Sequence, residues 1–148
     1  MKVSTFVASG AGSGYAPRAP GTAGSLVGLL FGALLLPFGH LALLSGIIVA
    51  SIAGIWAIGR GGSAALDPGW IVIDEIAGQM IAMIALHRVS IIGLILAFAL
   101  FRLFDITKWG PIGWADQRHD EWGVMGDDWL AGVAAALVIA VLRLVLPL

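Results

Sequence analysis

An uncharged stretch of 41 residues separates Arg18 from Arg60. It is about twice as long as the roughly 20 apolar residues that one membrane-crossing helix needs. The segment Pro37-Phe38-Gly39-His40 interrupts the stretch near its middle with residues that end helices. These features predict a hairpin of two membrane helices, at about residues 22–36 and 41–59.

The rest of the chain predicts three more helices. The apolar run IVIDEIAGQMIAMIAL indicates the third, and its start has two alternatives. Asp67 and Pro68 have the residue types of an N-cap and a first helical position. Alternatively, residues 71–73 are extended and the helix begins near Asp74. The fourth helix is expected at about residues 90–104 and the fifth at about residues 128–146.

The composition favours a membrane location for these helices. Hydrophobic residues make up 59% of the chain and charged residues 11%, whereas roughly a quarter of the residues of a soluble protein are charged. We therefore predict an all-α fold, a polytopic membrane helix bundle of about five helices, as a single membrane-embedded domain over residues 1–148. An unusually apolar soluble bundle is the alternative, because several apolar runs are shorter than a full span. The N-terminus lacks the apolar core of a cleaved signal peptide, so we expect it to remain in the mature protein.

Five crossings distribute the charged residues unevenly between the two sides of the membrane. The positive-inside rule assigns the side richer in Lys and Arg to the cytoplasm, and all nine acidic residues fall on that side as well. We therefore expect a polar cytoplasmic face that carries the function. The net charge of −1 gives no indication of nucleic-acid binding, and the absence of cysteine excludes disulfides and cysteine nucleophiles. The basic residues of the richer side are Lys2, Arg18, Arg60, Arg102, Lys108 and Arg118, and those of the other side are Arg88 and Arg143.

Acidic residues gather at the predicted cytoplasmic ends of three apolar helices. Asp74 and Glu75 form one adjacent pair, Asp127 and Asp128 form another, and Asp105 ends a third helix. Helix N-terminal acids favoured by the macrodipole are the plain explanation of either pair alone. Because carboxylates are costly near hydrocarbon, two pairs and a fifth acid together indicate a site. With no Cys and few His, such a set suits a hard cation, Mg²⁺, with these five residues as candidate ligands.

Two further groups of residues suit an anion. Arg102, Asp105 and Lys108 are spaced three residues apart, so that Asp105 can hold a metal while the two cations bind phosphate oxygens. A ladder of surface ion pairs is the alternative. Thr22 and Ser25 stand at the start of the first helix, where free backbone N–H groups and hydroxyls bind anions, although an ordinary cap by Thr22 is also consistent. Together with the cation site, these groups point toward a phosphate on a lipid.

Four segments in order resemble the phosphatidylglycerophosphatase A family. They are APGTAGSLVGL, DPGWIVIDEIAGQ, FRLFDITK with the following Pro111-Ile112, and GVMGDDWLAG, and they extend over residues 19–132. The chain departs from the family pattern in the loop, where Trp109-Gly110 precedes Pro111 and Asp120-Glu121 replaces a Gly-Gly pair. Both departures affect the shape of the loop and the fit of the head group. We expect the loop from Trp109 to Trp122 to contact the head group or to act as a lid.

The resemblance implies an activity, a cofactor and a location. The activity is the hydrolysis of phosphatidylglycerophosphate to phosphatidylglycerol and inorganic phosphate, with Mg²⁺, at the cytoplasmic face of a bacterial inner membrane, with no protein partner identified. By position, the resemblance also implies a role for Asp67. The catalytic candidates are Asp74, Glu75, Asp105 and Asp128, the metal ligands are these four with Asp127, and the substrate-binding residues are Thr22, Ser25, Arg102 and Lys108.

Within this hypothesis, Glu75 is the expected group that orients or deprotonates the attacking water. A phospho-aspartate intermediate is the variant, although the haloacid-dehalogenase arrangement is not supported, because Thr107 stands where a second Asp would follow Asp105. One rival is a phosphotransferase that passes the lipid phosphate to an alcohol. A rival of another class is a divalent-cation channel or carrier, but such a protein is expected to carry acids along the membrane depth or on both faces.

Overall fold

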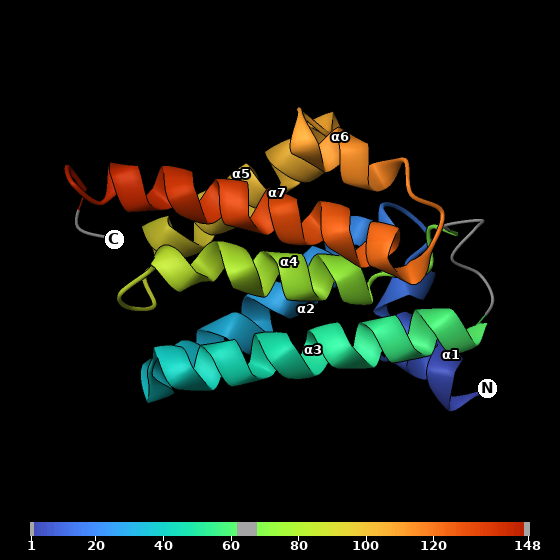
Figure 1. Cartoon of the computed structure of the whole chain (residues 1–148). Coiled ribbons are helices and arrows are strands. Elements are labelled where there is room, and N and C mark those ends of the chain that lie inside the picture. The colour runs from blue at the N-terminus through green and yellow to red at the C-terminus, as the bar shows by residue number, and fades with distance from the viewer. Residues whose placement is uncertain (1, 62–67, 147–148) are drawn as a thin grey trace.

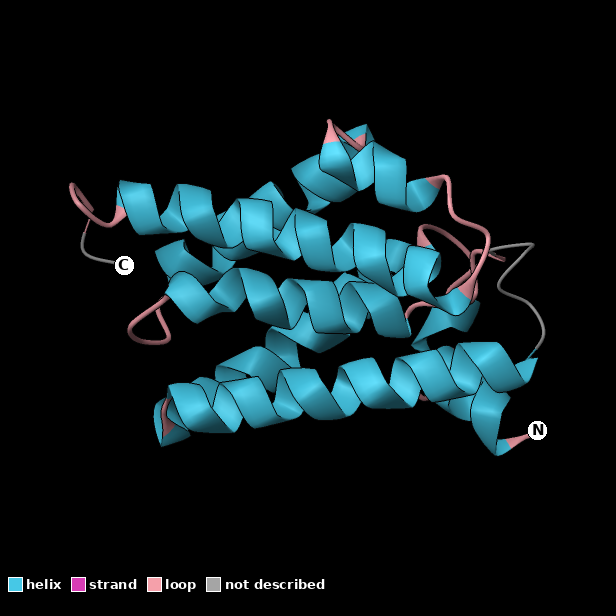
Figure 2. Ribbon diagram, viewed as in Figure 1, coloured by secondary structure: helices cyan, strands magenta, loops and turns pink. Residues whose placement is uncertain are grey.

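The computed structural model describes residues 2–61 and 68–146, which form a bundle of helices without strands (Figures 1 and 2). Short 3₁₀ turns follow two of the helices, η2 (Leu36–Phe38) after α2 and η4 (Met83–Ala85) after α4, and a third, η1 (Ser13–Tyr15), precedes α2. The all-α prediction is confirmed. The helices are α1 (Val3–Ala8), α2 (Pro20–Leu35), α3 (His40–Gly61), α4 (Ile73–Ala82), α5 (Ile91–Thr107), α6 (Pro111–Asp116) and α7 (Glu121–Leu142).

The five predicted helices correspond to α2, α3, α4, α5 and α7, whereas the short helices α1 and α6 were not predicted. The largest difference in bounds is at the start of α7, which begins seven residues earlier than predicted, at Glu121. The Asp120 side chain accepts a hydrogen bond from the Gly123 N–H and caps this earlier start. Asp127 and Asp128 therefore lie inside α7, and their placement at a helix N-terminus was wrong.

The start of α4 distinguishes the two alternatives for the third helix. Val72 lies before the helix, and its N–H donates a 2.9 Å hydrogen bond to the carbonyl of Ala8. The helix itself begins at Ile73, so the predicted start near Asp74 is confirmed to within one residue, whereas the expected extended backbone over residues 71–73 was wrong, because Ile73 is helical and Val72 has φ of −144° and ψ of 7°. Asp67, the other proposed start, lies outside the described residues.

Three described helices are long and apolar enough to cross a membrane: α2 with η2, α3 and α7. Large apolar side chains on the outer faces of the long helices are exposed, which suits contact with lipid tails. By contrast, α4 lies in the centre of the bundle, and eight of its ten residues are buried. The chain is thus a membrane helix bundle built around α4. The exposed side chains include Leu30 and Leu34 on α2, Ile48 and Ile52 on α3, Ile92 and Ile95 on α5, and Leu137 and Val141 on α7.

The inner end of α4 is held by side chains from other helices. The Nε2 of His40, the first residue of α3, donates to the carbonyls of Ile84 and Leu86 at 3.1 and 3.0 Å. Arg143, which follows α7, donates to the carbonyl of Ala85. These carbonyls belong to the η4 turn that follows α4 and to its C-cap Leu86, and the contacts satisfy groups that a helix leaves unpaired at its C-terminus.

Glycines allow α4 and α7 to pack backbone against backbone. A Cβ added to Gly78 of α4 would lie 2.6 Å from the carbonyl oxygen of Asp128 and 2.6 Å from the Phe101 ring. A Cβ added to Gly132 of α7 would collide with the carbonyl oxygen of Gly78. Such close approach is typical of small residues at membrane helix interfaces. It brings the acidic turn of α4 next to that of α7.

Substitution of Gly78 by Ala is expected to destabilise the fold. The methyl group meets backbone and a buried ring, neither of which can move away, and such overpacking costs about 1–3 kcal/mol. The matched control is Gly59→Ala on α3, where the added Cβ has no neighbour closer than 3.6 Å. Thermal unfolding in detergent should show a lower Tm for Gly78→Ala and an unchanged or slightly higher Tm for Gly59→Ala. Equal Tm values for the two variants would contradict the close packing.

Candidate active site

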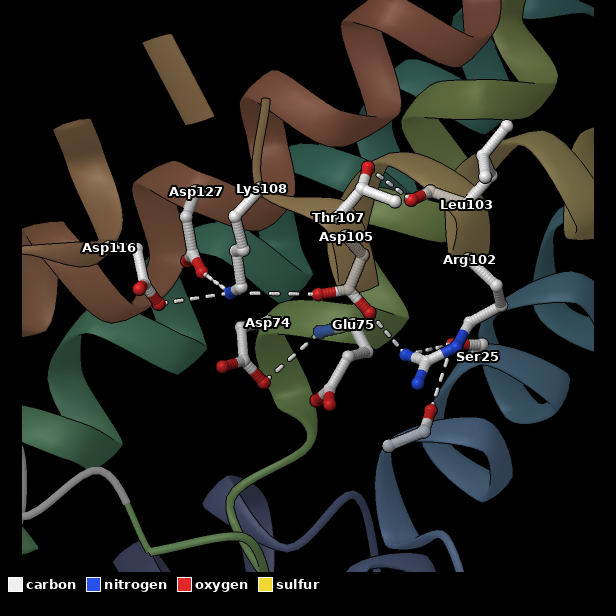
Figure 3. Close-up of polar contacts among 11 residues, drawn as sticks. Ser25, Asp74, Glu75, Arg102, Leu103, Asp105, Thr107, Lys108, Asp116 and Asp127 are labelled. Atoms are coloured by element: carbon white, nitrogen blue, oxygen red, sulfur yellow. Dashed lines mark hydrogen bonds and ion pairs between the residues drawn. The ribbon is translucent and has the colours of Figure 1, made fainter. Parts of the chain in front are cut away.

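The polar side chains of the bundle meet at the end where α2, α4 and α7 begin and α5 ends (Figures 1 and 3). The close-up shows Ser25 of α2, Asp74 and Glu75 of α4, and Asp127 of α7 directed toward the same region as the end of α5. Because no two of these helices are joined by a short turn at this end, the chain brings the groups together only through tertiary packing.

Three carboxylates form the centre of this region. Asp74, Glu75 and Asp128 each offer an oxygen, and these oxygens lie within 4.8 Å of one another. Asp74 and Asp128 are buried, and Glu75 is half-buried. One oxygen of Glu75 and one of Asp128 are buried without a hydrogen-bond partner among the described residues. Three converging carboxylates with free lone pairs repel one another and favour a bound cation.

A second group connects α5 to the start of α2. The Arg102 guanidinium forms an ion pair with the carboxylate of Asp105, three residues later. The same guanidinium nitrogen lies 3.4 Å from the hydroxyl oxygen of Ser25, which itself donates to the Gly21 carbonyl at 2.8 Å. Ser25 is fully buried. Arg102 is therefore held between a carboxylate and the first turns of α2.

Lys108 lies among three carboxylates. Its ammonium forms an ion pair with Asp127, lies 3.0 Å from Asp116 and 3.7 Å from Asp105. Burial lowers the pKa of Lys108, but the hydrogen bond and charge of Asp127, the charge of Asp128 and the hydrogen bond of Asp116 outweigh it and raise the pKa above its ordinary value. The ammonium therefore stays charged throughout the physiological pH range. Lys108 is also the C-cap of α5, in the left-handed conformation with φ of 51°.

Two contacts of this region were not predicted from the sequence. Asp116, at the end of α6, binds Lys108 and so ties the short helix to the site. Gly21 lies against the site, because a Cβ added there would meet the Glu75 carboxylate and lie 3.3 Å from Arg102. Nothing in the local sequence indicates the first contact. The sequence does give a signal for the contact of Gly21, since a glycine in the first turn of a helix permits close approach of another group.

Most of the predicted site residues do lie close together, but the acidic residues form two groups, and this division was not predicted. Asp74, Glu75 and Asp128 form the three-oxygen cluster, whereas Asp105 and Asp127 bind the two cations. The remaining predicted residues are Thr22 and Asp67. Thr22 is the third residue of α2 and does not cap it, since the helix begins at Pro20. Within the described chain its side chain makes no hydrogen bond to the cluster, and Asp67 lies outside the described residues.

The fold and this site define a class of protein. It is an all-helical membrane protein with a buried, carboxylate-rich site at one end, flanked by an arginine and a lysine. Carboxylates of this kind are suited to a hard cation, and the two basic side chains are suited to a phosphate.

Comparison with known proteins identifies the family within this class. The chain belongs to the phosphatidylglycerophosphatase A family, whose model matches residues 6–143, and it is thus a phosphatase. It is 36% identical to the phosphatidylglycerophosphatase A of Haemophilus influenzae, covering 90% of this chain and 85% of that protein. It is 33% identical to the Escherichia coli protein of the same name, covering 90% and 80%.

A third relative carries a different name. The chain is 41% identical to a protein of Bacteroides thetaiotaomicron described as a putative phosphatidylinositol-3-phosphatase, over 95% of this chain and 94% of that protein. No solved structure matches the chain. The family and the relatives agree on a phosphatase and differ in the lipid head group that they name.

Proposed function

We propose that the protein is a Mg²⁺-dependent lipid phosphatase that converts phosphatidylglycerophosphate to phosphatidylglycerol and inorganic phosphate. The observation that carries the proposal is the meeting of three carboxylates from α4 and α7 beside Arg102 and Lys108, in a chain of the phosphatidylglycerophosphatase A family.

The donor set fits magnesium. The cluster offers only carboxylate oxygens, which Mg²⁺ prefers, and it leaves buried oxygens of Glu75 and Asp128 without a partner. Asp74, Glu75 and Asp128 would hold the ion, and substrate phosphate oxygens would complete its ligands. Asp105 and Asp127 lie next to this set and are occupied by the two cations. When bound, the ion supplies neutralisation of charge that develops on the phosphoryl oxygens.

The two cations are placed to bind the phosphoryl group. Arg102 and Lys108 lie on opposite sides of Asp105, and each is half-buried, so that a phosphate would compete with carboxylates for them. A charge-assisted hydrogen bond from guanidinium to phosphate is strong and directional. Ser25 and the first turn of α2 hold Arg102 in position. Positioning and charge neutralisation of this kind supply most of the catalysis in phosphoryl transfer.

Glu75 is the proposed group that orients or deprotonates the attacking water. Its carboxylate lies in the three-oxygen cluster and faces the start of α2, so it can reach a water beside the phosphoryl group. In the variant mechanism, an aspartate attacks the phosphoryl group and forms a phospho-aspartate that water then hydrolyses. The phosphotransferase rival differs in needing an alcohol, and the channel rival is not favoured, because the family is one of enzymes.

A phosphorylated inositol lipid is the second candidate substrate. The relative described as a phosphatidylinositol-3-phosphatase shares 41% identity, more than the two phosphatidylglycerophosphatases reported above. Both head groups present a phosphomonoester near a membrane surface, so the same cluster could serve either. The region from Trp109 to Trp122, which includes α6, is the expected source of head-group selection, because Asp116 binds it to the site.

We further propose that the site faces the cytoplasm of a bacterial inner membrane. The site end of the bundle includes Arg102 and Lys108, and Arg143 lies at the other end beside Ala85. The excess of basic residues predicted for the site end, six against two, assigns that end to the cytoplasm.

An assay of the purified protein in detergent tests the activity and the metal. Phosphate release from phosphatidylglycerophosphate should require Mg²⁺, fall by roughly a hundredfold or more in EDTA, and return when Mg²⁺ is restored. A parallel assay with phosphatidylinositol 3-phosphate decides between the two lipids, and glycerol 3-phosphate shows whether the lipid tail is needed. Full release in EDTA would remove the metal from the proposal. Release that required an added alcohol would support the phosphotransferase instead.

A further inference from the structure

Gln79 is a buried polar residue that the proposed site does not explain. It lies on α4 one turn after Glu75, its exposed fraction is 0%, and neither atom of its amide has a hydrogen-bond partner among the described residues. Burying an unpaired amide costs roughly 1–3 kcal/mol. The other side chains around it on α4 are apolar, such as Met80 and Ala82, so a polar group is not needed for packing.

The geometry of α4 directs this amide toward the site. Residues four apart on a helix are neighbours, and helical side chains lean toward the N-terminal end of the helix. The Gln79 side chain therefore leans toward Glu75 and away from the membrane interior. On its other side, a Cβ added to Gly28 of α2 would lie only 3.0 Å from the Gln79 Cβ. The backbone of α2 thus packs on the stem of Gln79 and restricts the directions in which the amide can turn.

α2 and α4 also contact the site groups that lie one helical turn from Gln79, toward the start of α4. Gly21 of α2 lies against Glu75, and Ser25 of α2 binds Arg102. Arg102 has a buried Nε–H without a partner in the described part of the chain, and Glu75 has a buried oxygen in the same state. The Arg102 Nε–H and the Gln79 amide are therefore two hydrogen-bond donors without a partner among the described residues. They lie in successive helical turns of the region where α2, α4 and α5 meet.

We propose that Gln79 is a phosphate-binding residue that donates its amide N–H to an oxygen of the phosphoryl group held by Arg102. This inference rests on the proposed function and extends the site one turn deeper along α4. An oxyanion accepts from both donors at once, and a hydrogen bond from a buried, preorganised amide stabilises the charge that develops during transfer.

Substitution of Gln79 by Met separates binding from packing. Met has a similar length and no polar atoms, so a residue that only packs would gain stability from the change. We expect an unchanged or higher Tm, a kcat about 100-fold lower, and weaker inhibition by inorganic phosphate. The matched control is Ile76→Met, on the same helix but in the apolar core, which should leave kcat and phosphate inhibition unchanged. A Gln79→Met enzyme with wild-type kcat and wild-type phosphate inhibition would overturn the role of Gln79.

A second measurement needs no substitution at this residue. The sequence has two glutamines, Gln79 and Gln117, and Gln117 is exposed. With ¹⁵N-labelled glutamine side chains, addition of inorganic phosphate and Mg²⁺ should shift the Gln79 amide signals and leave those of Gln117 unchanged. Gln117→Asn assigns the signals. If the Gln79 amide signals do not shift in protein that hydrolyses lipid phosphate, only this inference is contradicted. If wild-type protein hydrolyses neither lipid, the proposed function itself is contradicted.

Discussion

Asp128→Asn and Asp74→Asn should each lower the rate of phosphate release by roughly a thousandfold while the protein still folds and inserts. The amide keeps the shape of the carboxylate but lacks the charge that a cation needs. Each change also removes the charge of one of three carboxylates that offer oxygens within 4.8 Å of one another, so that repulsion in the folded state decreases. The Tm of either variant should therefore equal or exceed that of the wild type.

The control for this pair is Asp120→Asn. Asp120 lies at the surface with its side chain 42% exposed, caps α7 and pairs with Arg118. Asn caps a helix about as well as Asp, and an exposed ion pair contributes little, so turnover and Tm should both be retained. Phosphate release and thermal unfolding, measured on the same preparations, decide the outcome. Wild-type turnover in both Asp74→Asn and Asp128→Asn would refute the carboxylate cluster as the catalytic centre.

Lys108→Met is expected to lower both stability and activity. The ammonium is the cation shared by Asp105, Asp116 and Asp127, and Asp127 is buried. Removing one partner of a buried pair leaves an uncompensated charge and costs about 3–5 kcal/mol, of which the lower end is expected here because the Lys108 side chain is 30% exposed. Turnover should fall by roughly a hundredfold or more, since a phosphate-binding cation is lost.

A double variant separates the two effects of Lys108. Lys108→Met combined with Asp127→Asn removes the unpaired carboxylate and should recover much of the Tm without recovering turnover. Lys108→Arg keeps the charge and should retain the fold. The wild type, Lys108→Met, Asp127→Asn and the double variant form the cycle, and thermal unfolding and phosphate release are measured on each. Wild-type stability of the single Lys108→Met variant would show that the cation does not hold α5 and α7 together.

The sequence predicted the membrane helices well because their signal is local. Hydrophobic runs and the break at Pro37–His40 indicate α2 and α3 with errors of two residues or fewer at each bound. The start of α7 was missed because its first six residues include two glycines and a tryptophan, which give no helical pattern, and only the Asp120 cap reveals it. Short helices such as α6 depend on tertiary contacts, here with α7 and Lys108, and local sequence does not encode these.

The sequence predicted which residues belong to the candidate site, but not which of them bind one another. Charge in an apolar chain identified the five carboxylates and the two cations. Which acid would bind a cation and which would join the cluster depends on how α4 and α7 pack, and that contact is fixed by Gly78 and Gly132. Gln79 had a signal in the sequence, because it is a polar residue in an apolar helix and lies four positions after Glu75. Spacing alone, however, does not distinguish such a residue from an incidental polar residue.

The short length of α4 has a consequence for how the protein enters its membrane. Its ten residues extend about 15 Å, roughly half of a hydrocarbon core of about 30 Å. The carbonyls of the η4 turn that follows it, and that of Leu86, accept hydrogen bonds from His40 and from Arg143, which follows α7. We therefore expect α4 to be a poor autonomous insertion signal that reaches its final depth only after α7 has been synthesised. Catalytic competence would then require that α7 and Arg143 have been synthesised, and ribosome-stalled chains ending before Arg143 should be inserted yet incompletely assembled.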